Sequence, residues 1–296
     1  MYNKGIELSL ESANISKSNF TWTSNINFTT LANEVTSLTD NNADIVGTTS
    51  NLEQTNITRL GYSLGSIYAV RTTGVNPANG NRIFLNKDGK QVQFCHVVPA
   101  GQSRWTYMDG TSAPAITGAD AVVIGNALPK WYGGFNNTFK FRDVIDLNIG
   151  ITFSGGNYVY NGSKAGMRDQ RFWNNSTDVL HRWTTDGQVT DIPKVVFGDN
   201  VSNGSAFAIS ENVEKADFIK FRNIALGYTF TEKVFGKTGI TSLRAYAQVS
   251  NIYTLTKYTG SDPEVSSNGN SNLTPSVDRN TVPQATTYTF GINLTL

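Results

Sequence analysis

Few residues in this sequence have the types and spacing that catalysis or metal binding requires. The chain contains one cysteine, Cys95, so it can form no internal disulfide and has no Cys-x-x-Cys metal motif. Its two histidines, His96 and His181, lie in different segments. A zinc or catalytic site needs several such ligands, or an acid matched to a base. We therefore expect no catalytic residues, no metal site and no enzymatic activity.

Two carboxylates and several glycine pairs are the remaining candidates for chemistry. The motif Asp262-Pro263-Glu264 places two carboxylates in one loop, but calcium needs more oxygen ligands and acid–base catalysis needs a matched pair. Because Asp and Pro are common in turns, we interpret this motif as structural. The glycine pairs at 133–134 and 155–156 lack the following Lys-Ser/Thr of a phosphate-binding loop. No cofactor is expected.

Aromatic side chains in the polar segments are better candidates for ligand binding. Flat rings offer a large contact area at low entropic cost, and they can stack on sugars or peptides. The alternative is that these rings pack the loops together, since a long loop must bury something to stay ordered. The candidate substrate-binding residues are Trp105, Tyr107, Phe172, Trp173 and Trp183.

Strands with a period of two are the elements that must position these residues. In residues 287–296 the aromatic and aliphatic side chains fall on one face, and Thr, Gly and Asn fall on the other. We count about eight such strands, most of about 10 residues, which is the length that a tilted strand needs to cross a bilayer. The other strands cover residues 6–11, 20–28, 60–71, 131–141, 145–153, 224–230 and 242–256.

The composition also favours strands and argues against several classes of protein. Charged residues make up 16% of the 296 residues, well below the roughly 25% of soluble domains. The net charge of +1 provides no strong field for nucleic acid, so no nucleic-acid partner is expected. No apolar stretch approaches the ~18 residues of a transmembrane helix. Residues 1–10 lack the features of a signal peptide, so an export signal would have to lie on other sequence.

The spacing of the strands distinguishes a membrane barrel from a soluble sandwich, in which strands also have one apolar face. Connections are unequal: residues 142–143 and 231–240 are short, whereas 73–130, 155–216 and 257–285 are long and polar. Outer-membrane barrels have short periplasmic turns and long outer loops, and aromatic residues near their strand ends. We therefore predict an all-β, antiparallel transmembrane β-barrel with long extracellular loops. The segment 32–59 departs from this pattern, because it falls on the periplasmic side and exceeds a turn.

Six stretches, in the same order along the chain, resemble the C-terminal region of the SusC/RagA family of TonB-linked outer-membrane transporters. Together they cover nearly the whole chain. They are NKGIEL with FTWT at residues 3–8 and 20–23, PKWYGGFNNTF at 129–139, RWT with TDIP at 182–184 and 190–193, FIKFRNIALGY at 218–228, SNIYTLTKY with DPE at 250–258 and 262–264, and TYTFGINL at 287–294.

The resemblance implies that residues 1–296 are the C-terminal part of a larger barrel of about 22 strands. It implies an N-terminal plug domain and signal peptide that are absent from this sequence. It further implies a SusD-like surface lipoprotein as partner, energy from the TonB complex, outer-membrane lipid around the barrel, and import of oligosaccharides or peptides. Leu296 departs from the family pattern, which more commonly ends in an aromatic residue.

Two other interpretations remain open from the sequence. The chain could be a soluble or surface β-rich module that binds carbohydrate, such as an adhesin or lectin. It could also be a small self-contained barrel, since eight strands can close. A closed small barrel would need larger inward side chains than the Thr, Gly and Asn found here.

Overall fold

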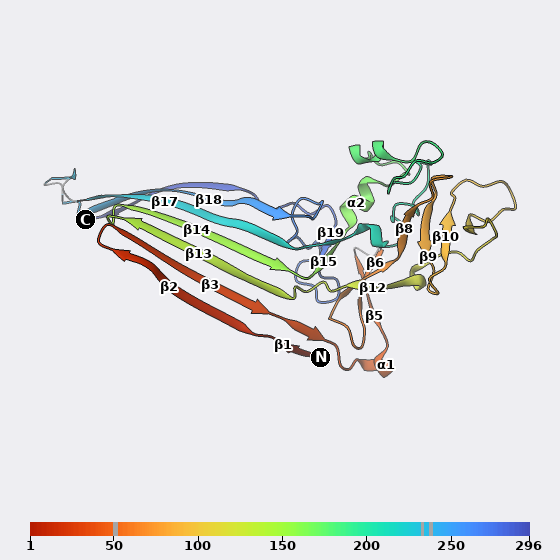
Figure 1. The fold of residues 1–296 in the computed structure, drawn as a ribbon, viewed down its shortest axis with the longest axis horizontal. Helices are drawn as coiled ribbons and strands as arrows, with labels where there is room; N and C mark the ends of the chain where they lie inside the picture. The colour runs from red at the N-terminus through yellow and green to blue at the C-terminus, as the bar shows by residue number, and fades with distance from the viewer. Residues whose placement is uncertain (50–52, 232–233, 237–238) are drawn as a thin grey trace.

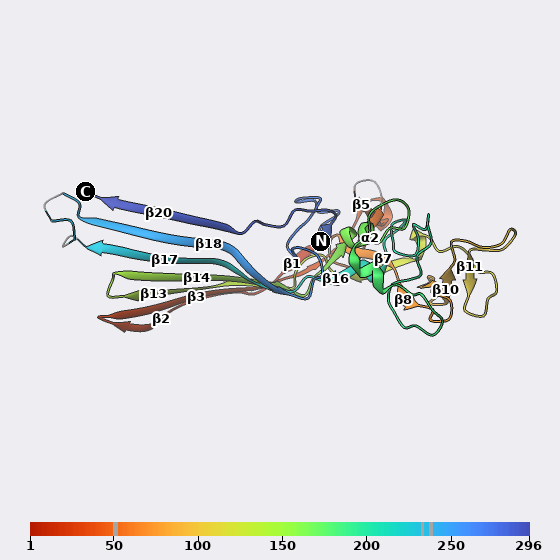
Figure 2. The same ribbon diagram turned by 90° about the horizontal axis from the view of Figure 1, so that it is seen from above.

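A seven-stranded antiparallel sheet of long strands forms one half of the molecule (Figures 1 and 2). The computed structural model describes residues 1–49, 53–231, 234–236 and 239–296. In spatial order, the strands are β2 (Glu7–Lys17), β3 (Phe20–Thr30), β13 (Trp131–Phe141), β14 (Ile145–Gly155), β17 (Phe218–Thr231), β18 (Ser242–Thr256) and β20 (Thr287–Thr295).

Cross-strand register gives this sheet one apolar and one polar face. Phe135 of β13 lies opposite Ile26 of β3 and Ile151 of β14. Because side chains alternate along a strand, the adjacent row belongs to the other face. That row consists of Asn25, Asn136 and Gly150. The predicted alternation is therefore confirmed across neighbouring strands as well as along each one.

The apolar face is open to the surroundings. Phe290 is 79% exposed and Leu226 is 52% exposed, although each lies on a regular strand. In a soluble sandwich a second sheet would cover these side chains. In the part of the chain that the structure describes, β2 and β20 are edges that do not pair with each other. The sheet is thus neither half of a sandwich nor a small closed barrel.

One polar cluster interrupts the apolar face, and its groups bind one another. The side chain of Asn137 accepts hydrogen bonds from Trp22 Nε1 at 2.9 Å and from Ser24 Oγ at 2.7 Å. Ser24 in turn accepts a hydrogen bond from Asn14 at 2.7 Å. Polar groups in a hydrocarbon environment must be satisfied internally. This cluster is therefore compatible with a face that meets lipid.

Short turns join the long strands at the end of the molecule that also holds the C-terminus (Figure 1). Arg142 and Asp143 both have positive φ, of 51° and 54°, which is the backbone of a type I′ hairpin turn. The tight Arg-Asp turn predicted from the sequence is thus confirmed. Of the predicted connection at 231–240, residues 232–233 and 237–238 lie outside the described residues.

Three long connections, residues 31–130, 156–217 and 257–286, lie at the opposite end (Figures 1 and 2). We call the structure that they form the loop body. The first connection holds β4 (Ala32–Glu34), which pairs with β1 (Tyr2–Lys4), and α1 (Thr39–Asn42). It also holds β5 (Ile45–Thr49), β6 (Glu53–Thr58), β7 (Ser66–Val70), β8 (Thr72–Val75), β9 (Arg82–Leu85), β10 (Gln91–Phe94), β11 (Trp105–Tyr107), the 3-10 helix η1 (Gly118–Asp120) and β12 (Ala121–Gly125).

The second and third connections have less regular structure. The second contains β15 (Tyr158–Asn161), α2 (Gly162–Met167), the 3-10 helices η2 (Thr177–His181) and η3 (Ser210–Asn212), and β16 (Val213–Lys215). The third contains β19 (Val277–Asp278), which pairs in parallel with β15. Among the described residues, no helix has the length and apolar character that crossing a membrane requires.

The loop body has hydrophobic cores of its own, built from more than one connection. One core joins Phe84 and Phe94 of the first connection to Ile209 of the second. Another joins Ile67, Tyr160 and Val277, one residue from each connection. The loops therefore hold each other in place by apolar packing, independently of the sheet.

The predicted strand at residues 60–71 is wrong as a member of the long sheet. Only Ser66–Val70 is extended there, and it pairs with β6 and β12 in a four-stranded sheet of the loop body. All five residues of β7 are buried, so this is a short core strand rather than a strand with one outward face. The long sheet consequently has seven strands where about eight were predicted. The segment 32–59 then lies in the loop body, at the same end of the sheet as the other long connections, which removes its misfit.

We expect a lysine to be tolerated on the polar face of β17 and not on its apolar face. Replacing Ile224 by Lys would place a charge where we expect lipid, which costs about 2–4 kcal/mol near the bilayer midplane. Ala225, the next residue of β17, faces the other side and provides the control. The measurement is the amount of folded, membrane-inserted protein for I224K and A225K in the complete protein that contains this segment. Equal insertion of both variants would contradict lipid contact.

Candidate functional site

The short helix α2 organises the candidate site in the second connection. Asn161 begins the helix, because its side-chain oxygen accepts a hydrogen bond from the backbone N–H of Lys164 at 2.9 Å. The helix ends after Met167. Lys164 and Arg168 are four residues apart, so they share one side of the turn.

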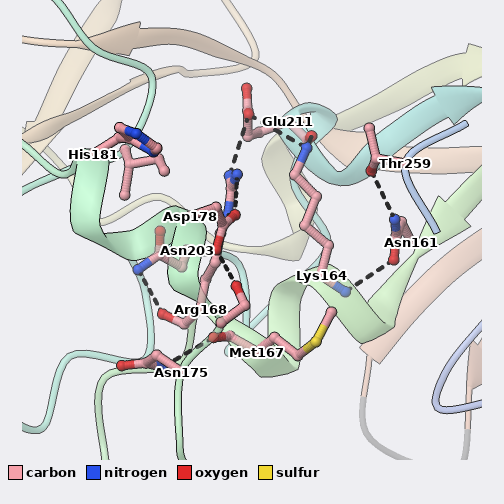
Figure 3. A network of polar contacts seen from close by, with 12 residues as sticks. Asn161, Lys164, Met167, Arg168, Asn175, Asp178, His181, Asn203, Glu211 and Thr259 are labelled. Atoms are coloured by element: carbon pink, nitrogen blue, oxygen red, sulfur yellow. Dashed lines mark hydrogen bonds and ion pairs between the residues drawn. The ribbon is translucent and has the colours of Figure 1, made fainter. Parts of the chain in front are cut away.

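The charged ends of Lys164 and Arg168 lie beside carboxylates (Figure 3). The Lys164 ammonium lies 3.6 Å from Glu211 and 3.4 Å from Glu214. The Arg168 guanidinium pairs with Asp178 at 2.6 Å and lies 3.6 Å from Glu211. Arg168 is only 7% exposed, whereas the Asp178 side chain is 39% exposed, so water reaches this pair from the Asp178 side. These contacts tie α2 to η2, η3 and β16.

Hydrogen bonds from asparagines attach the same helix to its neighbours (Figure 3). Asn203 donates to the carbonyl oxygen of Arg168 at 2.9 Å, and Asn175 donates to that of Met167 at 3.0 Å. These bonds satisfy carbonyl groups that the helix end would leave unpaired. Asn161 donates to Thr259 Oγ1 at 3.4 Å, which joins α2 to the third connection.

A cavity of about 870 Å³, the polar pocket, lies against this network. Most of the residues that line it have hydroxyl, amide or charged side chains. The polar lining residues are Asn161, Ser163, Lys164, Arg168, Ser176, Thr177, Asp178, Asp191, Thr259, Ser261, Asp278, Asn280 and Thr281. Such a surface can donate and accept many hydrogen bonds at fixed positions, which suits a hydroxyl-rich or amide-rich ligand.

A second cavity of about 550 Å³, the aromatic pocket, is lined by Phe172 and Trp173. Their ring centroids are 4.8 Å apart, and the two side chains are 74% and 57% exposed. Two ion pairs line the same pocket: Arg171 with Asp169 at 2.7 Å, and Arg279 with Glu53. Exposed rings beside fixed polar groups are a common arrangement for binding small molecules.

The two pockets adjoin, because Met167 and Asn280 line both. We call the combined surface the outer groove. It receives residues from all three long connections, namely Glu53 from the first, α2 from the second and Asn280 from the third. An extended ligand that occupied both pockets would therefore contact every loop at once.

Burial and ion pairing act in opposite directions on the carboxylates of the groove. Burial raises the pKa of Glu53, and the hydrogen bond from Arg279 only partly offsets this. For Asp169, burial also raises the pKa, but the hydrogen bonds from Arg171 outweigh it and the net pKa is lowered. The pKa of Asp178 is likewise lowered, since hydrogen bonds from Ser176 and Arg168 outweigh burial.

The five aromatic residues predicted to bind substrate fall into two groups. Phe172 and Trp173 line the aromatic pocket. Trp105 and Tyr107 instead pack against the core that contains Phe84. Trp183 packs against Gly80, and its Nε1 donates to the carbonyl oxygen of Pro77 at 2.8 Å. The structure thus brings two of the five together and places the other three in contacts that hold the loops.

The motif Asp262-Pro263-Glu264 binds the top of the sheet. The Lys220 ammonium of β17 lies 3.0 Å from Asp262 and 2.7 Å from Glu264, and Arg222 lies 2.7 Å from Glu264. Lys220 and Asp262 are 3% and 4% exposed. These contacts support the structural interpretation of the motif. They also show that Lys220 and Arg222 hold the third connection against strand β17 of the seven-stranded sheet.

Most residues of the polar pocket were missed by sequence reasoning, because each is an ordinary loop residue on its own. The four-residue spacing of Lys164 and Arg168 was a usable signal, since on a helix it would place the two cations on one side. Their partners Glu211 and Glu214 lie more than forty positions later in the sequence. No local pattern indicates such a contact.

We expect acid to loosen α2 through Asp178. A carboxylate whose pKa is lowered in the folded state contributes stability above its unfolded pKa, and that contribution is lost as pH falls through the folded value. The loss should therefore occur below the ordinary value of 3.8. Protease protection of the 162–181 segment, measured against pH, should converge between wild type and D178N at acid pH and differ at pH 7. A difference that persists unchanged at pH 2–3 would contradict this role.

Comparison with known proteins gives matches over almost the whole chain. No protein-family profile matches it. TonB-dependent receptor P3 of Formosa agariphila is 28% identical over 99% of this chain and 28% of its own length. TonB-dependent receptor SusC of Bacteroides thetaiotaomicron is 26% identical over 99% of this chain and 26% of its own length. The chain thus spans less than a third of the length of these relatives.

A solved structure has the same fold. The RagAB peptide transporter superposes with a TM-score of 0.76 at 22% identity, over 99% of this chain and 29% of that one. The curated relatives are named as receptors rather than enzymes. Together these similarities confirm the predicted resemblance: over nearly its full length, the chain is similar to part of the SusC/RagA-like TonB-dependent receptors.

Proposed function

We propose that this chain is the barrel part of an outer-membrane transporter that imports oligosaccharides or peptides. In this proposal the apolar face of the seven strands contacts lipid, and the polar face lines the interior of a larger barrel. The loop body lies on the outer side and carries the outer groove. The remaining strands, the plug domain and the export signal belong to other sequence of the complete protein.

The observation that carries the proposal is the uncovered apolar face beside a loop body on one end only. An apolar surface of this extent on a soluble protein would drive aggregation, whereas lipid stabilises it. The opposite face is polar or small at most positions of the strands, which suits a water-filled or plugged interior. The loop cavities then lie where an arriving ligand would first meet the protein.

Only a short stretch of the third connection separates the outer groove from strand β17 of the sheet. Asn280 lines both pockets, and Gln284 accepts a hydrogen bond from Arg222 of β17 at 2.7 Å. Five residues thus connect the ligand-binding surface to the polar face of the sheet. A ligand that shifts the 280–284 stretch would alter the contacts of Arg222, so binding outside and changes at the wall are mechanically linked.

Partners are part of the proposal. RagAB is named as a peptide transporter, and SusC is named as TonB-dependent. By analogy we propose a SusD-like surface lipoprotein over the loop body and energy supplied by the TonB complex. In this scheme the chain supplies part of the barrel wall and the surface that binds the ligand, and it performs no bond-making chemistry.

The test of this function is energy-dependent uptake by the complete protein. Cells that express it should take up a labelled mixture of oligosaccharides and peptides, and deletion of the gene should abolish that uptake. Removal of TonB should stop uptake but leave surface binding intact, because binding precedes energy use in this scheme. Uptake that persists without TonB, or binding with no uptake in energised cells, would contradict the proposal.

Among the five aromatic candidates, we expect Phe172 and Trp173 to affect ligand binding and Trp105 to affect folding. Replacing Trp173 by Ala removes a stacking surface, and affinity should fall about tenfold. Replacing Trp105 by Ala opens a cavity in a core, which costs about 3–5 kcal/mol of stability. Binding and thermal unfolding of W173A and W105A, measured side by side on the complete protein, separate these effects. Unchanged affinity in W173A would exclude the aromatic pocket as a binding surface.

A further inference from the structure

The charges of the outer groove are unequally neutralised. All four cations that line it, Lys164, Arg168, Arg171 and Arg279, have carboxylate partners within ion-pair distance. Two carboxylates of the polar pocket, in contrast, are not neutralised by an ion pair. Within the described part of the chain, Asp191 and Asp278 have no cationic partner within ion-pair distance.

The cations of the groove are occupied by more carboxylates than they can neutralise. Glu211 and Glu214 do not line the polar pocket, but both contact Lys164. Glu211 also contacts Arg168 (Figure 3). Their negative charge is therefore placed directly behind the two positive side chains of the wall. A ligand anion that approached Lys164 or Arg168 would have to compete with these carboxylates, which are already in place.

Asp278 and Asp191 add negative charge from other sides of the pocket. Asp278 is fully buried, and its carboxylate accepts hydrogen bonds from Tyr258 Oη at 2.7 Å and Ser163 Oγ at 3.1 Å. These hydroxyls orient the carboxylate without cancelling its charge. Asp191 is exposed at the pocket surface. The buried Arg82 acts on Asp191 electrostatically, but it does not line the pocket and forms no ion pair with Asp191 among the described residues. A like charge on a ligand would therefore still meet repulsion at Asp191.

We propose that the outer groove excludes anionic ligands and accepts uncharged or amine-bearing chains, with Asp191 as the residue that sets this selectivity at the surface. The inference rests on the proposed function, because it concerns the ligand of the same groove. Acidic oligosaccharides, such as sulfated or uronate-containing chains, and acidic peptides would be rejected. Neutral chains would bind through the hydroxyl and amide groups of the polar pocket and the rings of the aromatic pocket.

The experiment offers the complete protein a library in which each neutral oligosaccharide and peptide has an acidic counterpart on the same backbone. Retained molecules are identified by mass spectrometry. We expect acidic members to be depleted about tenfold relative to their neutral counterparts. The depletion should weaken at about 1 M salt, where the Debye length is about 3 Å. Equal or preferential retention of acidic members would overturn the proposal.

Two variants at exposed aspartates test the role of Asp191. Replacing Asp191 by Lys should reduce the depletion of acidic members about tenfold, and D191N should have a smaller effect in the same direction. Asp186 is exposed in the same segment and does not line either pocket, so D186K is the matched control and should leave the depletion unchanged. A D191K variant that behaves like D186K would overturn the assignment to Asp191.

Failure of the proposed function gives a different result from failure of the selectivity. If the wild-type protein retains no member of the library, neutral or acidic, the groove is not a ligand site, and the proposed function and this inference fall together. If neutral members bind and acidic members bind equally well, the groove is a ligand site and only the selectivity is wrong.

Discussion

Backbone hydrogen bonding between seven long strands is the interaction on which the rest of this molecule depends. Registers run unbroken for eleven residue pairs between β13 and each of its neighbours β3 and β14. An apolar face that meets lipid can carry no unpaired N–H or C=O group, so the ladder must be continuous where the face is uncovered. The same ladder holds the polar residues in one row per strand pair. The two-faced character of the sheet is thus a consequence of its pairing, and in the described residues β2 and β20 form its edges.

The loop body solves a different problem, because it cannot use the sheet for burial. It builds its own cores from residues of separate connections and attaches to the sheet by charges. Lys220 and Arg222 on β17 hold Asp262 and Glu264 of the third connection. Buried pairs of this kind contribute little net stability compared with apolar packing, but they specify one position for a loop. Here these pairs fix the position of the third connection, which helps to form the outer groove, relative to strand β17 of the sheet.

Sequence reasoning found the parts of this structure that depend on local pattern. Alternation identified the long strands, and the tight turn at Arg142 and Asp143 follows from their spacing. It failed at residues 60–71, because alternation does not distinguish a strand with one outward face from a short strand buried on both sides. It also could not rank the loop aromatics. Trp105 and Trp173 look equivalent in sequence, and only the packing of distant segments separates a core residue from a pocket residue.

Two charge arrangements on the polar face distinguish the ends of the wall. Near the short turns, Arg244 of β18 reaches over Gly227 to Asp146 of β14, with Nε 2.9 Å from the carboxylate. Any side chain at Gly227 would occupy that space, so the pair closes within the sheet and needs no other segment. Near the loops, the carboxylate partners that the structure describes for Lys220 and Arg222 come from the third connection, although Arg222 also donates to Thr152 and Asn251 of the sheet. A shift of that connection would leave these cations unpaired, whereas the turn end would be unaffected. Rearrangement that follows ligand binding should therefore be confined to the loop end, with the lower wall as a fixed support.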